Sequence, residues 1–137
     1  AALALVGCKK NAHDQVKADL LSIGIELSEE ATLTNHYEDA TLTDYYESYD
    51  LKLTKTDVLH VASRIRERVP FIDSITTSQQ IAPFEHRHQD TTFSIGYRTS
   101  SGYALEVFEG HKGKKFTFFQ YDLDTTAVSL KYTVFVN

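Results

Sequence analysis

The last third of this sequence restricts the fold more than any other part, because it reads as four successive β-strands. Apolar and polar residues alternate in 93–97, 103–107 and 128–136, and residues 115–121 are rich in aromatic side chains. A period of two is typical of half-buried strands. Short segments with Gly, Ser or Asp lie between these strands. Because strands joined by short connections pair antiparallel, we predict a C-terminal meander.

A helix is expected near the start of the chain. Val16, Leu20 and Ile23 follow the spacing of one helical face, which predicts an amphipathic helix over about residues 14–23. Gly24 is a candidate for its C-terminal end, because glycine readily adopts the left-handed conformation found there.

A strand and a second helix are expected in the middle of the chain. Residues 45–53 alternate in polarity and predict a half-buried strand. The second helix should begin at an N-cap, Thr54 or Thr56, and should stop at Pro70. Residues 71–83 are interpreted as a linking region. The apolar stripe of the second helix consists of Val58, Val61, Ala62, Ile65 and Val69.

These elements predict a single α+β domain over residues 14–137. We expect an antiparallel sheet of about four to five strands, built around the C-terminal meander, with one or two helices packed on one face. The chain has 137 residues, of which 42% are hydrophobic and 24% are charged. These values fit one globular domain and differ from those of disordered chains.

An acidic, tyrosine-rich segment is the first candidate for a functional surface. Nine acidic residues and no Lys or Arg lie between Ala18 and Leu51. Within it, ATLTNHYED (31–39) is followed by the similar ATLTDYYES (40–48), which indicates two neighbouring strands or a strand preceded by a similar loop. Acidic groups interleaved with tyrosines favour binding of a cationic protein. The candidate partner-binding residues are Tyr37, Glu38, Asp39, Tyr46, Glu47 and Asp50. The alternative is a solvated surface, partly neutralised by Arg64, Arg66 and Arg68.

Histidines are the second candidate. His86 and His88 would share a face of an extended segment, and His111 or Glu106 could approach them from a neighbouring strand. The pair is a weak metal candidate, because a zinc site needs three or four ligands and the motif H-E-x-x-H is absent. No G-x-S-x-G elbow is present either. We therefore expect no cofactor and disfavour an enzyme, although a small hydrolase or metal-dependent enzyme using His86 and His88 is an alternative. A carrier of a small apolar ligand is another.

Charge and hydropathy argue against two classes. The formal charge of −5 argues against general nucleic-acid binding, which depends on Lys and Arg at phosphates. The sequence also has no apolar run of the roughly twenty residues that a membrane-spanning helix requires.

The N-terminal region carries a resemblance to a known protein class. Residues 1–7 are small or apolar, and Leu5 to Cys8 read LVGC, which resembles the lipobox of bacterial lipoproteins. The resemblance implies that residues 1–7 are the remnant of a signal peptide, that Cys8 carries lipid, and that residues 8–13 form a short tether. A buried structural cysteine and a catalytic nucleophile are the alternatives for Cys8.

The resemblance also implies a location in the bacterial cell envelope, with the membrane bound through the lipid on Cys8. In enteric members of the class an aspartate after the cysteine signals retention in the inner membrane. Lys9 occupies that position, so we expect the outer membrane, with the domain facing the periplasm. The expected function is binding of a protein partner, as in an inhibitor or immunity protein.

Overall fold

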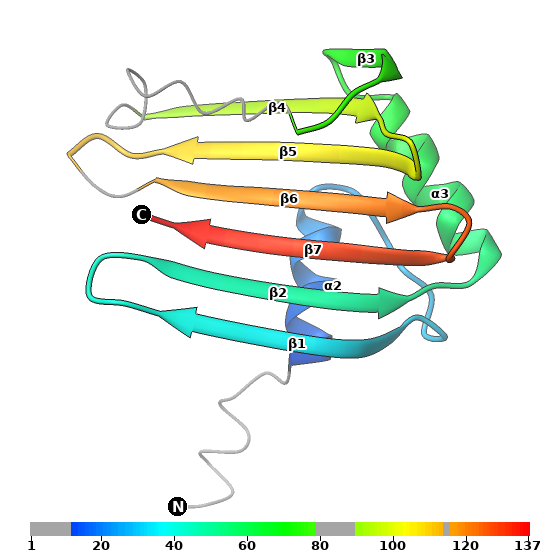
Figure 1. Ribbon diagram of the computed structural model, residues 1–137, viewed down its shortest axis with the longest axis horizontal. Helices are drawn as coiled ribbons and strands as arrows, with labels where there is room; N and C mark the ends of the chain where they lie inside the picture. Colours follow the sequence, from blue (N-terminus) through cyan, green and yellow to red (C-terminus); the bar gives the residue numbers. More distant parts are fainter. Residues whose placement is uncertain (1–11, 79–89, 114–115) are drawn as a thin grey trace, which may run out of the picture.

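The described part of the protein is a seven-stranded sheet with two helices on one face (Figure 1). The computed structural model describes residues 12–78, 90–113 and 116–137. Along the chain the elements are α2 (Ala12–Ser22), β1 (Thr32–Ala40), β2 (Tyr45–Lys52), α3 (Lys55–Arg66), β3 (Phe71–Ile75), β4 (Thr91–Arg98), β5 (Gly102–Gly110), β6 (Thr117–Asp124) and β7 (Ser129–Val136).

The α+β class and the C-terminal meander are confirmed, but the sheet is larger than predicted. Strands β4 to β7 pair antiparallel in chain order. The sheet has seven strands instead of four to five. One additional strand comes from the repeat, whose two copies contribute the antiparallel neighbours β1 and β2.

Part of the expected linking region, residues 71–83, is also a strand. Phe71–Ile75 forms β3, which pairs parallel with the edge of β4. Three of its five residues are exposed and its polarity does not alternate. A short strand at a sheet edge buries little, so its sequence carries little of the pattern from which strands are predicted.

The C-terminal strand joins the two parts of the sheet. The strand order is β1-β2-β7-β6-β5-β4-β3, so β7 lies between the β1–β2 hairpin and the rest of the meander (Figure 1). All eight residues of β7 are in register with both β2 and β6. The hairpin is therefore one end of a continuous sheet, with β1 at its edge.

Helix α2 ends in a Schellman motif. The Gly24 N–H donates to the Leu21 carbonyl at 3.0 Å, and the Ile25 N–H donates to the Leu20 carbonyl at 2.9 Å. Gly24 has φ +83°, which is the left-handed conformation expected of this residue. Leu20 and Ile25 are both fully buried, so the cap is fixed by packing as well as by hydrogen bonds.

Helix α3 begins at a capping box. Thr54 is the N-cap: its hydroxyl accepts from the Asp57 N–H, and the Asp57 side chain accepts from the Thr54 N–H. The apolar stripe from Val58 to Ile65 is buried as predicted. Val69 is 91% exposed, because the helix ends at Arg66 and Val69 lies beyond it.

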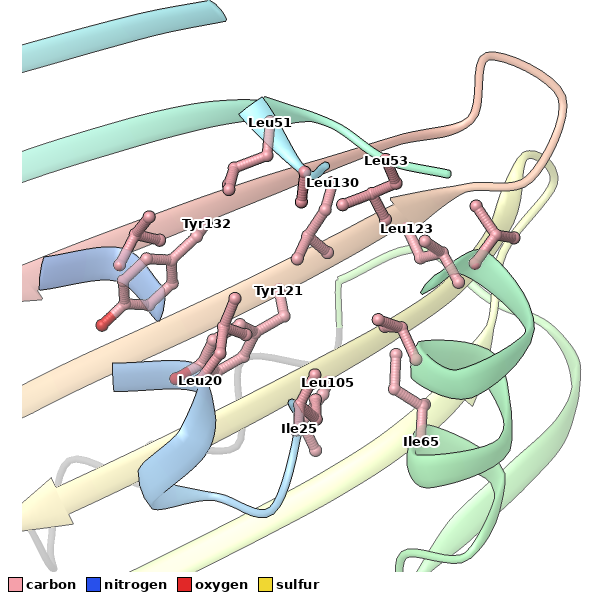
Figure 2. Close-up of a cluster of buried hydrophobic side chains, with 14 of the residues drawn as sticks. Leu20, Ile25, Leu51, Leu53, Ile65, Leu105, Tyr121, Leu123, Leu130 and Tyr132 are labelled. Atoms are coloured by element: carbon pink, nitrogen blue, oxygen red, sulfur yellow. The ribbon is translucent and has the colours of Figure 1, made fainter. Parts of the chain in front are cut away.

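The hydrophobic core lies between the two helices and one face of the sheet (Figure 2). Leu20 and Ile65 come from the helices, and Leu105, Tyr121 and Tyr132 come from the sheet beneath them. The Tyr132 hydroxyl donates to Asp19 Oδ2 of α2 at 3.0 Å, which satisfies the polar end of a fully buried ring. Neither of the described helices, α2 and α3, covers the opposite sheet face, which we call the helix-free face.

Candidate functional site

The β1–β2 hairpin carries all six predicted partner-binding residues, but on two faces of the sheet. Successive residues of a strand point to opposite faces. The register pairs Glu38 with Glu47, which places both on the helix face. The helix-free face carries Tyr37, Asp39, Tyr46 and Asp50. The six residues therefore do not form one surface, and the two groups need separate functional interpretations.

The four residues on the helix-free face are called the hairpin surface below. Tyr37 is 54% exposed and meets the Tyr46 ring edge to face, with 6.0 Å between centroids. Asp39 is exposed and lies opposite Tyr46. Asp50 is half-buried, lies opposite Lys131 of β7, and accepts a 3.4 Å hydrogen bond from the Asn35 amide. Because Asp50 has cationic and amide neighbours, Asp39 contributes most of the uncompensated charge.

An aromatic row continues from the hairpin surface across the helix-free face. Tyr46, Phe135, Phe118, Phe108 and Phe93 occupy neighbouring positions on β2, β7, β6, β5 and β4. Phe108 is fully buried, and Phe93 is 38% exposed. The hairpin surface thus lies at one end of a row of aromatic residues that crosses the helix-free face.

On the helix face, Glu47 is the centre of a hydrogen-bonded group. It accepts from the hydroxyls of Tyr45 and Tyr49 and contacts His36 Nε2 at 2.8 Å. Burial opposes its ionisation, but the hydrogen bonds from Tyr45, Tyr49 and His36 outweigh burial and lower the pKa of Glu47 below its usual value. Glu47 is consequently a carboxylate at neutral pH.

His36 is the exposed end of a ladder of stacked rings. Its imidazole lies 4.6 Å from the Tyr49 ring at an interplanar angle of 11°. Tyr49 stacks on Tyr132 at 5.5 Å, and Tyr132 stacks on Tyr121 at 4.7 Å. The four residues are in register on β1, β2, β7 and β6. The ladder links the imidazole to the buried core.

His36, Glu38 and Glu47 could hold a metal ion. One ligand atom from each lies within 4.8 Å of the other two. Glu38 and Glu47 were predicted as partner-binding residues, whereas His36, Tyr45 and Tyr49 were not among the predicted site residues. The sequence feature that could have indicated this group is the H-x-E spacing of His36 and Glu38 in a segment that could form a strand. A second glutamate, Glu47, occupies the equivalent position of the repeat.

The arginines considered for neutralising the hairpin interact elsewhere. Arg64 pairs with Glu67 at 3.3 Å within the α3 region. Arg66 lies over the Tyr103 ring, 5.6 Å from its centroid. Arg68 donates to the Ile23 carbonyl.

Three sequence candidates, Cys8, His86 and His88, lie outside the described residues. Glu106, a predicted neighbour of His86 and His88, is fully buried on β5, where it accepts from Ser78 Oγ at 2.7 Å and from the Tyr97 hydroxyl at 3.1 Å. Burial, followed by the charge of Glu106, raises the pKa of the nearby Asp122. His111 is exposed in the β5–β6 connection.

A groove of about 540 Å³ lies beside α3. Val58, Ala62, Tyr103 and Val128 contribute its apolar lining. It opens at the surface, whereas the space between the helices and the sheet is filled by the core side chains. The apolar-ligand carrier stays a prediction.

Comparisons with known proteins do not assign the chain to a family. No protein-family model matches the chain, and no match was found among curated proteins or solved structures. No helix in the described part of the chain has the length and apolar character that crossing a bilayer requires.

Proposed function

We propose that this protein is a lipid-anchored protein of the bacterial cell envelope whose domain binds a protein partner through the hairpin surface. The observation that carries the proposal is the exposed Tyr37, which packs edge to face on Tyr46 and lies next to Asp39 at the edge of the sheet. Tyrosine provides a large contact area at a low cost in conformational entropy. The adjacent carboxylates favour a partner with an exposed basic segment.

The edge position of β1 supports binding of an extended segment. Within the described residues β1 pairs with β2 alone, and eight of its nine residues are exposed. An extended peptide can add to such an edge through main-chain hydrogen bonds. Its alternate side chains would then lie beside Tyr37 and Asp39, where Lys or Arg is favoured. The acidic side chains disfavour pairing between two copies of this strand.

The anchor proposal rests on the LVGC motif and on the short distance between Cys8 and the domain. Three residues separate Cys8 from Ala12, where α2 begins. Such a segment spans at most about 14 Å. The first turn of α2 is tied to the start of β1, because His13 Nε2 lies 2.9 Å from the Ala31 carbonyl oxygen. A lipid on Cys8 would therefore hold the β1 side of the sheet near the bilayer, which favours a partner at the membrane.

Site-specific photocrosslinking in the native host tests the surface. A photoreactive residue at Tyr37 should form a crosslink to one discrete envelope protein. The same residue at Leu59, which is 70% exposed on α3, is the matched control and should not capture that protein. Equal capture at the two positions would contradict the assignment of the hairpin surface.

A charge-reversal series with the purified partner tests the charge complementarity. Asp39→Lys should weaken binding about tenfold or more, mainly through a slower association rate, and added salt should reduce the difference from wild type. Glu67→Lys, on the exposed end region of α3, should leave binding unchanged. Unchanged affinity for Asp39→Lys would exclude this surface.

The anchor has its own test. Intact-mass analysis of protein made in the native host should find Cys8 at the N-terminus with attached acyl chains, and Cys8→Ser should abolish the modification. An unmodified thiol still joined to residues 1–7 would refute the anchor while leaving the partner-binding test unaffected.

A further inference from the structure

The repeat brings two glutamates face to face. In an antiparallel hairpin the two copies run in opposite directions, so only one position can lie opposite its own equivalent. In this hairpin that position is Glu38, which is in register with Glu47 on the same sheet face. Like charges directly opposite each other on neighbouring strands destabilise a sheet. A cation bound between the two glutamates would therefore stabilise the hairpin.

A nitrogen ligand lies beside this pair. His36 precedes Glu38 by two residues and shares its face, and His36 Nε2 is 2.8 Å from Glu47 Oε1. We propose that His36, Glu38 and Glu47 form a binding site for a divalent transition-metal ion, for which Zn²⁺ is the appropriate probe. Imidazole and carboxylate are established zinc ligands, at about 2.0–2.2 Å from the ion.

The geometry requires only local movement. Ligands of a tetrahedral zinc ion are about 3.4 Å apart, given the usual zinc–ligand distances. The three ligand atoms here already lie within 4.8 Å of one another. Rotation of the exposed Glu38 side chain and replacement of the contact between His36 and Glu47 would bring them into range. No change in the register of the hairpin is needed.

The surroundings hold two of the ligands in place. The stacked Tyr49 ring fixes the plane of the His36 imidazole, and the hydroxyls of Tyr45 and Tyr49 fix the Glu47 carboxylate. Such outer contacts orient metal ligands and reduce the entropy lost on binding. The side chains of His36 and Glu47 are 30% and 16% exposed, so an ion can enter from solvent and keep an open coordination position.

The ligand set distinguishes between ions. Mg²⁺ and Ca²⁺ prefer oxygen ligands, so the imidazole contributes little to their binding. Zn²⁺ and its neighbours in the first transition series accept imidazole nitrogen and carboxylate oxygen together. We therefore expect binding of Zn²⁺ to depend on His36, and weak binding of Mg²⁺ or Ca²⁺ at most.

Calorimetric titration of the untagged full chain with Zn²⁺ tests the site. A Cys8→Ser background removes the thiol, which is itself a zinc ligand. One ion should bind per chain. His36→Asn and Glu38→Gln should each reduce the affinity by about tenfold or more, because removal of an outer contact of a metal site alone reduces metal affinity by about that factor. Zn²⁺ should also raise the melting temperature of the background protein and have no such effect on His36→Asn.

Two histidine controls separate this site from the others. His111→Asn, in the exposed β5–β6 connection, and the double variant His86→Asn/His88→Asn should bind Zn²⁺ as the background protein does. Glu38 is exposed, so Glu38→Gln is expected to fold normally, which circular dichroism checks directly.

Several results would overturn the proposal. One is the absence of saturable Zn²⁺ binding to the folded background protein. Another is binding that survives in both His36→Asn and Glu38→Gln, or that is lost in the His86/His88 double variant. Equal affinity for Ca²⁺ and Zn²⁺, with no dependence on His36, would reduce the feature to an acidic pair without a transition-metal site.

Discussion

Asp57 ties the start of α3 to the loop before β1, so we expect its removal to be costly. Asp57 is only 4% exposed. It accepts from the Ser28 N–H at 2.9 Å, from the Ser28 hydroxyl at 2.8 Å and from the Thr54 N–H at 3.4 Å. The first two bonds join segments almost thirty residues apart, since Ser28 and Asp57 are 29 positions from each other. Asp57 therefore stabilises the packing of α3 as well as its first turn.

The magnitude follows from the two short bonds to Ser28. A hydrogen bond to a charged group contributes about 1.5–3 kcal/mol, and loss of a helix cap costs about 1 kcal/mol. Ser28 is exposed, so water can partly replace the hydrogen bond that its hydroxyl loses when the Asp57 carboxylate is removed. We expect Asp57→Ala to lower the free energy of unfolding by about 2–4 kcal/mol. Thr56→Ala, in the same turn but exposed, should change it by less than about 0.5 kcal/mol.

The pH dependence supplies a second measurement. Burial disfavours the charged form, but the hydrogen bonds from Ser28 and Thr54 outweigh burial and hold the pKa of Asp57 below its ordinary value. The stabilisation is therefore complete above the unfolded-state pKa, about 3.9, and is lost as the pH falls through the folded-state pKa. The difference in free energy of unfolding between wild type and Asp57→Asn should thus shrink in acid.

Urea unfolding at neutral pH and at a series of acidic pH values measures both effects. The Asp57→Ala, Ser28→Ala double-mutant cycle isolates the coupling between the two residues. A loss below about 0.5 kcal/mol for Asp57→Ala, or a wild-type advantage over Asp57→Asn that does not change with pH, would refute this account of α3 docking.

Three further measurements probe the core. Gly96→Ala would put a Cβ 2.7 Å from the Ile65 carbonyl oxygen, so α3 must shift away from β4. The free energy of unfolding, measured with urea, should therefore fall by about 1–3 kcal/mol. Ile65→Ala, at a fully buried position, should cost about 2–5 kcal/mol by urea unfolding, whereas Leu59→Ala at a 70% exposed position should cost less than about 0.5 kcal/mol. Burial raises the pKa values of Tyr97, Tyr121 and Tyr132, so the unfolded chain releases these protons near pH 10 while the folded chain retains them. The free energy of unfolding should therefore fall as the pH rises above about 10. The ultraviolet absorbance of tyrosinate should show that these three tyrosines ionise only when the protein unfolds. Ionisation of the three in a protein that is still folded would contradict this expectation.

The sequence predicts those parts of the fold in which local pattern and burial coincide. The alternation of β4, β5 and β7 was sufficient to predict these strands, because it is determined by immediate neighbours. The N-cap of α3 was predicted to be Thr54 or Thr56, and the structure shows that it is Thr54. β3 was not predictable in this way, because its five residues bury little and pair parallel with β4. The partner of Phe71, for example, is Gly96, which no short-range pattern connects with it.

The position of β7 shows a second limit. Its alternation specifies which of its residues face the helices, since a slip of one residue would move Leu130 and Tyr132 from the core to the helix-free face. The alternation does not specify the neighbouring strand. Pairing with β2 joins residues that are far apart in the sequence, and no local pattern records it.

The candidate site depends on register in the same way, and this explains why the sequence identified its residues but not their grouping. The β1–β2 turn is set by hydrogen bonds from the Thr41 N–H to the Asp44 carbonyl at 2.8 Å and from the Asp44 N–H to Thr41 Oγ1 at 2.9 Å. This turn places Glu38 opposite Glu47 and leaves Asp39 on the other face. A turn longer or shorter by one residue on the β1 side would exchange the faces of Glu38 and Asp39 relative to β2. The same acidic repeat would then place Asp39 near Glu47, and His36 would no longer share a face with that glutamate.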